Sequence, residues 1–573
     1  MKAAKLTGML MLALAAPALA SAPDAGSGDA LKFDPQAYTQ QVLTLPDGKT
    51  VNYRAYERIY YVTNVEDSTY QYLNFFVPES VYTTDAQDVP IFLKNNVGGY
   101  RAGNPGGLSA SSATGRALAE GYCVCIPGAR GSNSTVETKV SKKKTQTVYT
   151  GRAPAGLLDL KAAVRYLRYN DALMPGSAEL IITDGTSAGG AMSSLQGATG
   201  NHPLYEPYLE AMGAAPSTDE IFAAVCYCPI TDLDHADMAY EWLYQCTNTG
   251  VRALSEEQQA VSAELAAQYP AYLNSLGLKD KDGNAITDQN YLDYIKSFII
   301  KSAQRAKNET VSIPDTIGIV FNKPDFGGMM GGMMGGRRPG QGGPGQGGPG
   351  AQGAPQGAPQ GMGPGQGGPG NMGPGQGGQR PEGAPQGMGP GQGGPQGQMP
   401  AQMQQMMQRM RSMQGDIVID VDMNAYLSYV ATTQKLKAPP AFDTQDVVGG
   451  RASAENDVFG DAQGSSVNFT NYSLSKATGT DATIDADLAA RVFLMNPMNF
   501  IGDDQATKAQ HWYIRHGARD RDTSFCVPVN LATKLMNCGL DVNFFLPWNR
   551  PHSGDYNLDD LFCWIAQITK AAE

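Results

Sequence analysis

One short motif in the sequence has the residue types of an activated nucleophile. Residues 185–189 read Gly-Thr-Ser-Ala-Gly, which matches the pattern Gly-x-Ser-x-Gly. On a sharp turn between a strand and a helix, such a serine is pushed out at the carboxyl end of a sheet, and the glycines leave room for the cramped backbone. The apolar run 178–182 predicts the strand, and the small residues of 188–198 predict the helix. The pattern is common by chance, but this setting favours a nucleophile elbow at Ser187.

A serine hydroxyl attacks a carbonyl efficiently only when a base takes its proton and a buried carboxylate orients that base. Asp520 and His552 are candidates for these two roles, because each follows a predicted strand. Ser187, Asp520 and His552 occur in the chain order of the α/β-hydrolase arrangement. Four of the five histidines precede or abut the candidate acid: His202, His235, His511 and His516. His552 alone lies in a loop after the last strand; the alternative interpretation is a surface loop histidine.

Acyl transfer also requires backbone N–H groups that stabilise the negative charge on the carbonyl oxygen. Ala188, directly after the nucleophile, is expected to provide one, and Gly98 or Gly99 after the predicted strand 90–94 the other. A glycine pair there also suits a plain turn. This chemistry needs no cofactor, and we expect no metal site. Residues 280–284 resemble part of a calcium loop but lack its later acidic ligand, so a turn is favoured.

Strands alternate with helices in the two parts of the chain that hold these residues. An antiparallel hairpin is predicted first, over 51–63 and 70–77. Further strands are predicted at 90–94, 122–126, 178–182, 223–230, 512–515 and 542–546. Helices are predicted at 113–121, 157–169, 188–198, 525–537 and 559–570. The alternation predicts an α/β fold with a mostly parallel sheet covered by helices on both faces.

The regular alternation lapses in the middle of the chain. We therefore predict a core formed by 33–230 and 492–573, with 231–491 inserted as a large lid over the carboxyl edge of the sheet. The helical stretches of this insertion are predicted at 236–245, 255–276, 291–307 and 424–435. Within it, 327–398 is dominated by Gly, Pro, Gln and Met and cannot bury a core, which predicts disorder. The methionines around it are interpreted as a loop leading into a helix rather than a soft-metal site.

The N-terminus and the charge bear on location and partners. Residues 1–22 combine two lysines, an apolar run and small residues, as in a secretory signal peptide. No later run is apolar and long enough to span a bilayer. The net charge of −12 argues against nucleic acid or an anionic membrane as the main partner. We expect an exported protein, secreted or periplasmic, whose partner is a small-molecule ester.

The eight cysteines have the number but not the placement of a disulfide framework. Cys123 and Cys125 lie two residues apart in an apolar strand-like run, and so do Cys226 and Cys228, so each pair points to one face of a buried strand. Core packing is favoured over zinc ligation, while one or two disulfides remain open. Cys538 and Cys563 are predicted to lie on apolar faces of helices.

Several segments together resemble the bacterial tannase family. They are GTSAGG at 185–190, PITDLDHAD at 229–237, RHGARDRDTS at 515–524 and PHSGDY at 551–556. The resemblance covers most of the chain from about Phe33 onward, except the Gly-Pro-Gln-Met segment. It implies an α/β-hydrolase with a large lid that cleaves galloyl esters of plant polyphenols. The cysteines that link serine and histidine in fungal tannases and feruloyl esterases are absent, since Thr186 and Pro551 stand there.

The resemblance also implies roles for individual residues. The family's triad falls on Ser187, Asp520 and His552. Its galloyl-binding residues fall on Lys437, Glu455 and Asp522. The spacing in the lid varies and Lys435 lies nearby, so a solvated lid surface is the alternative for Lys437 and Glu455.

Three functions are therefore considered. The first is a secreted serine esterase of galloyl esters, with depside bonds as an extension. The second keeps the triad but acts on feruloyl or other phenolic esters, or on simple carboxylic esters. The third is a non-catalytic surface or binding protein that uses the low-complexity segment. The sequence does not indicate an oligomeric state.

Overall fold

The computed structural model describes residues 30–83, 89–248, 250–322, 417–432 and 434–571. The predicted signal peptide 1–22 and the predicted disordered segment 327–398 lie outside these residues. Within the described part, residues 231–322 and 417–491 belong to the same compact unit as the sheet. No helix in this part of the chain is long and apolar enough to cross a membrane.

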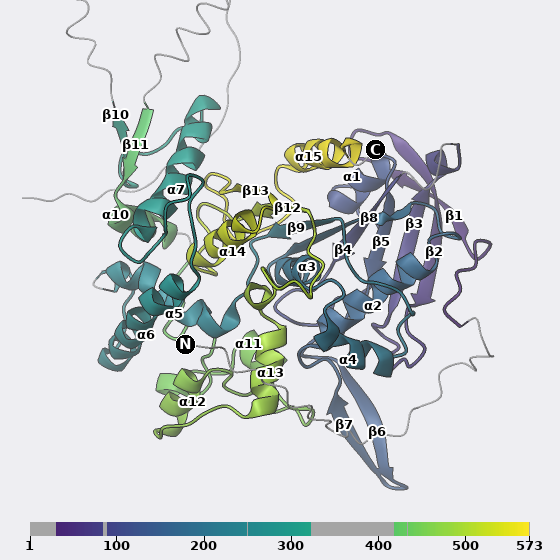
Figure 1. Ribbon diagram of the computed structural model, residues 1–573, viewed down its shortest axis with the longest axis horizontal. Coiled ribbons are helices and arrows are strands. Elements are labelled where there is room, and N and C mark those ends of the chain that lie inside the picture. The colour runs from purple at the N-terminus through teal and green to yellow at the C-terminus, as the bar shows by residue number, and fades with distance from the viewer. Residues whose placement is uncertain (1–29, 84–88, 249, 323–416, 433, 572–573) are drawn as a thin grey trace, which may run out of the picture. The chain divides into compact units, whose positions relative to one another are not determined.

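A nine-stranded sheet forms the centre of the fold, with strand order β1-β2-β3-β5-β4-β8-β9-β12-β13 (Figure 1). Neighbouring strands are parallel from β5 to β13, whereas β1, β2 and β3 are antiparallel and β3 joins β5 antiparallel. The bounds are β1 Thr39–Thr44, β2 Thr50–Tyr60, β3 Tyr72–Pro78, β4 Pro90–Asn95, β5 Cys123–Pro127, β8 Ser177–Thr186, β9 Ala223–Tyr227, β12 His511–Arg515 and β13 Asp541–Phe545. The predicted mostly parallel α/β sheet is confirmed.

Helices cover both faces of this sheet because both faces are apolar. Successive strand residues alternate between two hydrophobic clusters: Ile91 and Trp512 belong to one, and their neighbours Phe92 and Tyr513 to the other. The first cluster includes side chains of α2 Ala155–Tyr169, α3 Ala188–Ala198 and α14 Cys526–Asn537. The second includes side chains of α1 Ala113–Ala119 and α15 Leu558–Lys570.

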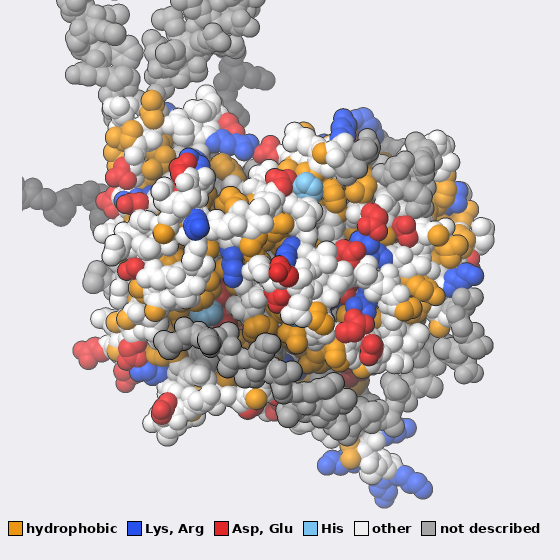
Figure 2. Space-filling view, viewed as in Figure 1, with side chains coloured by type: hydrophobic (Ala, Val, Ile, Leu, Met, Phe, Trp, Pro, Cys, Tyr) orange, Lys and Arg blue, Asp and Glu red, His pale blue; other side chains and the backbone are white. Residues whose placement is uncertain are grey.

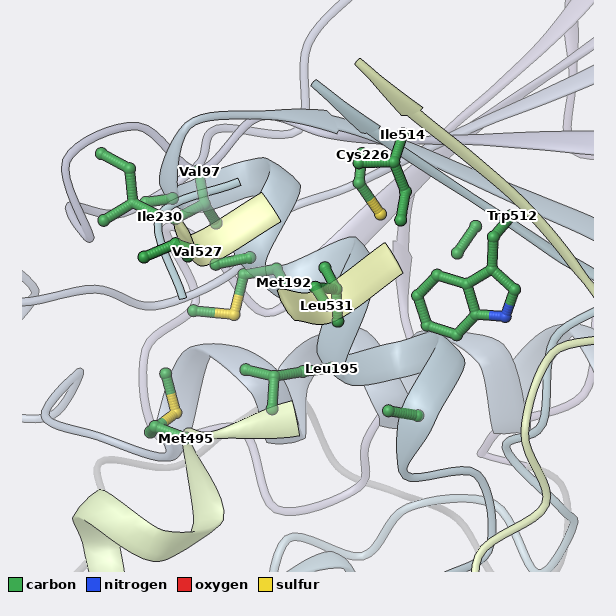
Figure 3. Close-up of a cluster of buried hydrophobic side chains, with 14 of the residues drawn as sticks. Val97, Met192, Leu195, Cys226, Ile230, Met495, Trp512, Ile514, Val527 and Leu531 are labelled. Atoms are coloured by element: carbon green, nitrogen blue, oxygen red, sulfur yellow. The ribbon is translucent and has the colours of Figure 1, made fainter. Parts of the chain in front are cut away.

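The first cluster fixes the helix that follows the elbow. Cys226, Trp512 and Ile514 of the sheet gather with Leu195 of α3 and Leu531 of α14, as Figure 3 shows. All of these side chains are fully buried. Burial of a side chain this size contributes about 1.5–3 kcal/mol, so the position of α3, and of the turn before it, is strongly constrained.

The cysteine predictions are partly confirmed. Cys123 and Cys125 in β5 are buried and share the first cluster, as predicted. The predicted shared face is wrong for Cys226 and Cys228: Cys226 of β9 is buried in the first cluster, but Cys228 follows the strand with a φ of 44° and is buried in the second. All eight cysteines lie within the described residues, and none forms a disulfide. The predicted apolar environment is wrong for Cys538 and Cys563, which are exposed. The apolar residues near them face the sheet from α14 and α15, and these two cysteines lie on the solvent side.

The segment predicted as a lid contains the expected helices and several elements that were not predicted. The expected ones are α5 Leu233–Tyr244, α6 Glu256–Ser275, α7 Tyr291–Asn308 and α10 Met423–Val430. The others are β10 Ile319–Asn322, β11 Ile417–Val421, α11 Ala454–Val458, α12 Asn471–Thr478 and α13 Ala486–Leu494. Helix α10 ends at Val430, before the predicted residue 435, and Gln434 beyond it accepts a hydrogen bond from Arg521 in the loop after β12. The strands β10 and β11 pair antiparallel, with Asn322 opposite Ile417.

The remaining elements lie at the periphery. Strands β6 Thr135–Ser141 and β7 Lys144–Tyr149 form a hairpin that pairs only within itself in the described part of the chain and extends away from the sheet (Figure 1). Its tip carries exposed lysines and is blue in Figure 2. The others are α4 Glu206–Ala211 and short 3-10 turns at Glu79–Thr83, Pro203–Tyr205, Gln245–Thr247, Val447–Gly449 and Pro497–Asn499.

Candidate active site

Ser187 lies on the sharp turn between β8 and α3, and its backbone has an uncommon conformation. Its φ is 63° and its ψ −124°, a backbone conformation that residues other than glycine rarely adopt. A Cβ on Gly185 would lie 2.2 Å from the Gly189 carbonyl oxygen, and a Cβ on Gly189 would lie 2.8 Å from the Val97 carbonyl oxygen. Both glycines of the motif are therefore required by close backbone approach.

Asp520 and His552 form a hydrogen-bonded pair at the ends of β12 and β13. The distance from His552 Nδ1 to Asp520 Oδ2 is 2.7 Å, and the second carboxylate oxygen accepts the backbone N–H of Asp522 at 2.8 Å. Burial alone would raise the pKa of Asp520, but His516, His552 and the Cys228 thiol hold it at about 2. Asp520 is thus ionised at neutral pH and fixes the His552 ring with Nδ1 as donor.

The pKa of His552 is raised above its usual value of about 6.5. Burial works against this shift, but the hydrogen bond and charge of Asp520, with the charge of Asp522, outweigh it. Lys437 opposes them and lowers the pKa. His552 therefore has the basicity that proton transfer near neutral pH needs.

The loop that carries His552 is packed against the elbow. A Cβ on Gly554 would lie 1.8 Å from Oγ1 of Thr186, the residue before Ser187. Lys94 at the end of β4 donates both to Asp184 of β8, at 2.6 Å, and to Asp555, at 3.0 Å. This pair of ion pairs was not predicted, although a lysine at the end of an otherwise apolar strand was a signal for it.

The predicted oxyanion residues lie around the same turn. Ala188 is the first residue of α3, where backbone N–H groups have no partner within the helix. The backbone from Asn95 to Val97 lies against the start of α3. A Cβ built on Gly189 would lie 3.0 Å from the Asn95 carbonyl oxygen and 2.8 Å from the Val97 carbonyl oxygen. Gly98 and Gly99 follow directly, with open space beside them. The structure thus brings these segments together at the elbow.

Glu455 and Asp522 both act electrostatically on Lys437, although the three residues are separated along the chain. Burial lowers the pKa of Lys437, while the nearby charges of Glu455, Asp522 and Asp237 raise it. Asp522 Oδ2 lies 4.0 Å from His552 Nδ1. Lys437 also covers the ring of Phe442, at 3.8 Å from its centroid. Lys435, the alternative lysine, is exposed, so Lys437 is the one that faces these carboxylates and His552.

The backbone of Lys437 is held by Tyr240 of α5 and by Arg252, which lies between α5 and α6. Its N–H donates to the Tyr240 hydroxyl at 3.1 Å, and this hydroxyl donates to the Arg521 carbonyl at 2.8 Å. Its carbonyl accepts from Arg252 at 2.8 Å. Arg252 and Glu241 form a fully buried ion pair, with two contacts of 2.7 Å. None of these supports was predicted, and no local pattern marks an arginine as the anchor of a residue so far along the chain.

Three groups of acidic, histidine or cysteine side chains bring polar atoms within 4.8 Å of one another in the described part of the chain. They are Cys228–His516–Asp520, Asp232–Asp234–His235 and Asp520–Asp522–His552. In the second group, Asp232 is hydrogen-bonded to His235 at 2.8 Å and accepts the Tyr272 hydroxyl at 2.6 Å. We interpret this group as a structural network, because its members satisfy one another.

Comparisons with known proteins agree with this geometry. A family model described as BD-FAE, an α/β-hydrolase family, matches residues 142–272. No significant match is found among curated proteins. Among solved structures, the chain is similar to a tannin acyl hydrolase from Lactobacillus plantarum, with 32% identity and a TM-score of 0.70, covering 94% of this chain and 99% of the other.

Two further solved structures extend this comparison. A tannase from Fusobacterium nucleatum has 31% identity and a TM-score of 0.70, covering 94% of this chain and 99% of the other. A tannin acyl hydrolase in complex with ethyl gallate has 32% identity and a TM-score of 0.69 over the same shares. Since these relatives match over nearly their full length, the chain belongs to the bacterial tannase family of α/β-hydrolases.

Proposed function

We propose that this protein is a serine esterase that hydrolyses galloyl esters of tannins and simple gallates, with Ser187 as the nucleophile. The observation that carries the proposal is the convergence of Lys437, Glu455 and Asp522 beside the Asp520–His552 pair. The solved complex of a relative with ethyl gallate supports the same substrate class. Release of gallate from methyl gallate by the purified chain tests the proposal, and no release would contradict it.

The mechanism follows from the roles of these side chains. Ser187 Oγ attacks the ester carbonyl while His552 Nε2 takes its proton, and Asp520 stabilises the resulting imidazolium. The N–H groups of Ala188 and of Gly98 or Gly99 stabilise the oxyanion. His552 then protonates the leaving alcohol. Water, activated by the same base, releases gallate from the acyl-enzyme, and no cofactor takes part.

Recognition of the acyl group follows from its three adjacent hydroxyls. Glu455 and Asp522 accept hydrogen bonds from hydroxyl groups, and Lys437 donates one to a hydroxyl oxygen. Each of these polar groups is partly or fully shielded from water. A ring that lacks the hydroxyls leaves them unpaired and is bound poorly.

The main alternative keeps the triad but changes the ester. A feruloyl, other phenolic or simple carboxylic esterase would not need a lysine with two carboxylates facing the acyl ring. Hydrolysis rates for methyl gallate, methyl ferulate and methyl 4-hydroxybenzoate distinguish these functions. Equal rates on all three would reject the galloyl pocket while leaving the serine mechanism intact.

The pH dependence should report the two charges that act on His552 in opposite directions. The base must be neutral, so kcat/KM should fall as the pH drops through a pKa above about 6.5. Asp522 raises this pKa and Lys437 lowers it. Asp522→Asn should therefore move the acid limb to lower pH, and Lys437→Met should move it to higher pH. Profiles of kcat/KM for methyl gallate measure both, and shifts in the same direction would contradict the assignment.

The non-catalytic alternative assigns the function to the low-complexity segment. Because Asn322 pairs with Ile417, residues 323–416 can be replaced by a short Asn-Gly turn that closes a β10–β11 hairpin. We expect this deletion variant to hydrolyse methyl gallate at nearly the wild-type rate, since the proposed site uses only described residues. Loss of hydrolysis in a variant with unchanged thermal stability would give the segment a direct role.

We also propose that residues 1–22 direct export, which would place the protein in the periplasm or outside the cell. The N-terminal sequence of protein recovered from these compartments tests this. A mature chain that still begins at Met1 would contradict it.

A further inference from the structure

His516 is a buried titratable residue that the proposed mechanism does not use. It directly follows β12, and its side chain is 0% exposed. Neither of its ring nitrogens has a hydrogen-bond partner within the described residues. An imidazole that is buried with both nitrogens unpaired costs free energy, so its retention beside the candidate triad needs a reason.

The carboxylate of the candidate triad acid lies close to this ring. His516 Nδ1 lies 3.6 Å from Asp520 Oδ2, the same oxygen that accepts from His552 Nδ1 at 2.7 Å. The ring is held edge-on against Phe525, with centroids 5.4 Å apart and an angle of 86° between the planes. The backbone N–H of His516 donates to the Phe545 carbonyl at 3.3 Å, which fixes the backbone at this residue. The ring thus packs against Phe525, and its Nδ1 is directed toward Asp520.

The charged and titratable groups around this ring come from several elements. They are Asp520 and Asp522 after β12, His552 after β13 and Cys228 after β9. Burial lowers the pKa of His516, and the charges of Asp520 and Asp522 only partly compensate. At neutral pH the ring is therefore uncharged, and one nitrogen carries a proton while the other does not.

We propose that His516 is a positioning residue for the triad acid: its neutral ring directs Nδ1–H at Asp520 Oδ2 and holds the carboxylate in the orientation that His552 requires. This inference rests on the proposed function, because Asp520 matters only if Ser187 and His552 carry out the acyl transfer. Asp520 Oδ1 is already held by the Asp522 N–H, so His516 restrains the other oxygen. A shift of about 0.5 Å brings the pair within hydrogen-bond length.

Removal of the donor should slow the chemical step without weakening substrate binding. In His516→Leu we expect kcat for methyl gallate to fall about tenfold, the usual effect of one lost buried partner of a charged group, with KM unchanged. The acid limb should also move to higher pH, since a carboxylate with one donor fewer attracts the proton on His552 more strongly. In His516→Gln, whose amide can donate to Asp520, we expect most of kcat to return.

His511→Gln is the matched control. His511 begins the strand that His516 follows, and it also contacts an aspartate, Asp541, at 2.7 Å, but at the opposite end of β12. This variant should match the wild type in kcat and in pH profile. The proposal is overturned if His516→Leu keeps the wild-type kcat and acid limb, or if the Leu and Gln variants lose activity equally.

A second measurement does not depend on the folding of the leucine variant or on turnover. The chain contains five histidines, so labelling histidine with ¹⁵N gives few ring signals in the full-length protein. Because its pKa is lowered from the usual value of about 6.5, the His516 ring should stay neutral from about pH 7 upward, with its proton on Nδ1. A proton on Nε2, or titration within this range, would overturn the proposal. Absence of gallate release by the wild type would instead reject the proposed function, so the two failures are distinguishable.

Discussion

Replacement of Ser187 by alanine is expected to lower kcat for methyl gallate by about 10⁴-fold or more, the range for loss of a serine nucleophile. Alanine leaves the backbone of the turn in place but removes the hydroxyl proposed to attack the carbonyl. KM should change little, because the residues proposed to bind the acyl ring are unchanged. Steady-state release of gallate measures this effect, and substantial activity in the variant would reject the serine mechanism.

The covalent intermediate gives an independent check of the same residue. Rapid quenching of the wild type during turnover should give a chain heavier by one galloyl group, located on the peptide that contains Ser187. Ser194→Ala is a suitable control, since this buried serine lies in α3, just beyond Ser187, and its hydroxyl donates to the Gly190 carbonyl at 2.8 Å and contacts the Cys226 sulfur at 3.3 Å. The control should retain activity and form the adduct, while Ser187→Ala should form none.

The second large effect is the selectivity for the hydroxyls of the acyl ring. A site built to bind hydroxyls rejects analogues without them by about 10⁴-fold in kcat/KM when its polar groups are left unpaired. We expect a preference of this order for methyl gallate over methyl benzoate. Glu455→Ala should reduce the preference by about tenfold or more, mainly by slowing methyl gallate, because it removes one buried acceptor.

Asp457→Asn provides the control for this selectivity. Asp457 lies in the same short helix α11 as Glu455 but accepts a hydrogen bond from Ser466. Its replacement should leave the ratio of kcat/KM for the two esters unchanged. If Glu455→Ala also left the ratio unchanged, the assignment of Glu455 to the acyl pocket would be wrong.

The parts of the fold that local patterns determine were predictable from the sequence. The parallel strands are short apolar runs whose alternate residues face the two hydrophobic clusters, as Ile91 and Phe92 do. Each such run can be recognised in the sequence without knowledge of its neighbours in the sheet. Ser187 had a local motif. The pairing of Asp520 with His552 followed from chain order, because consecutive parallel strands deliver their carboxyl ends to one edge.

The parts that depend on long-range packing were not predictable. Lys94 meets Asp555, and Arg252 holds the Lys437 carbonyl, through contacts between residues distant in sequence that no local pattern encodes. His516 was set aside because chain order excludes it as the base, and its burial beside Asp520 becomes evident only in three dimensions.

Because the φ of Ser187 is positive, the catalytic role proposed for this residue and the stability of the fold have opposite requirements. A side chain held in such a conformation costs about 1–3 kcal/mol, a noticeable fraction of the roughly 5–15 kcal/mol by which a typical domain is stable. Glycine at this position would relieve the strain but remove the hydroxyl. Selection for thermal stability alone is therefore expected to favour Ser187→Gly and to yield a more stable protein without esterase activity. The buried packing of α3 against the sheet offsets that cost and holds Ser187 in this conformation.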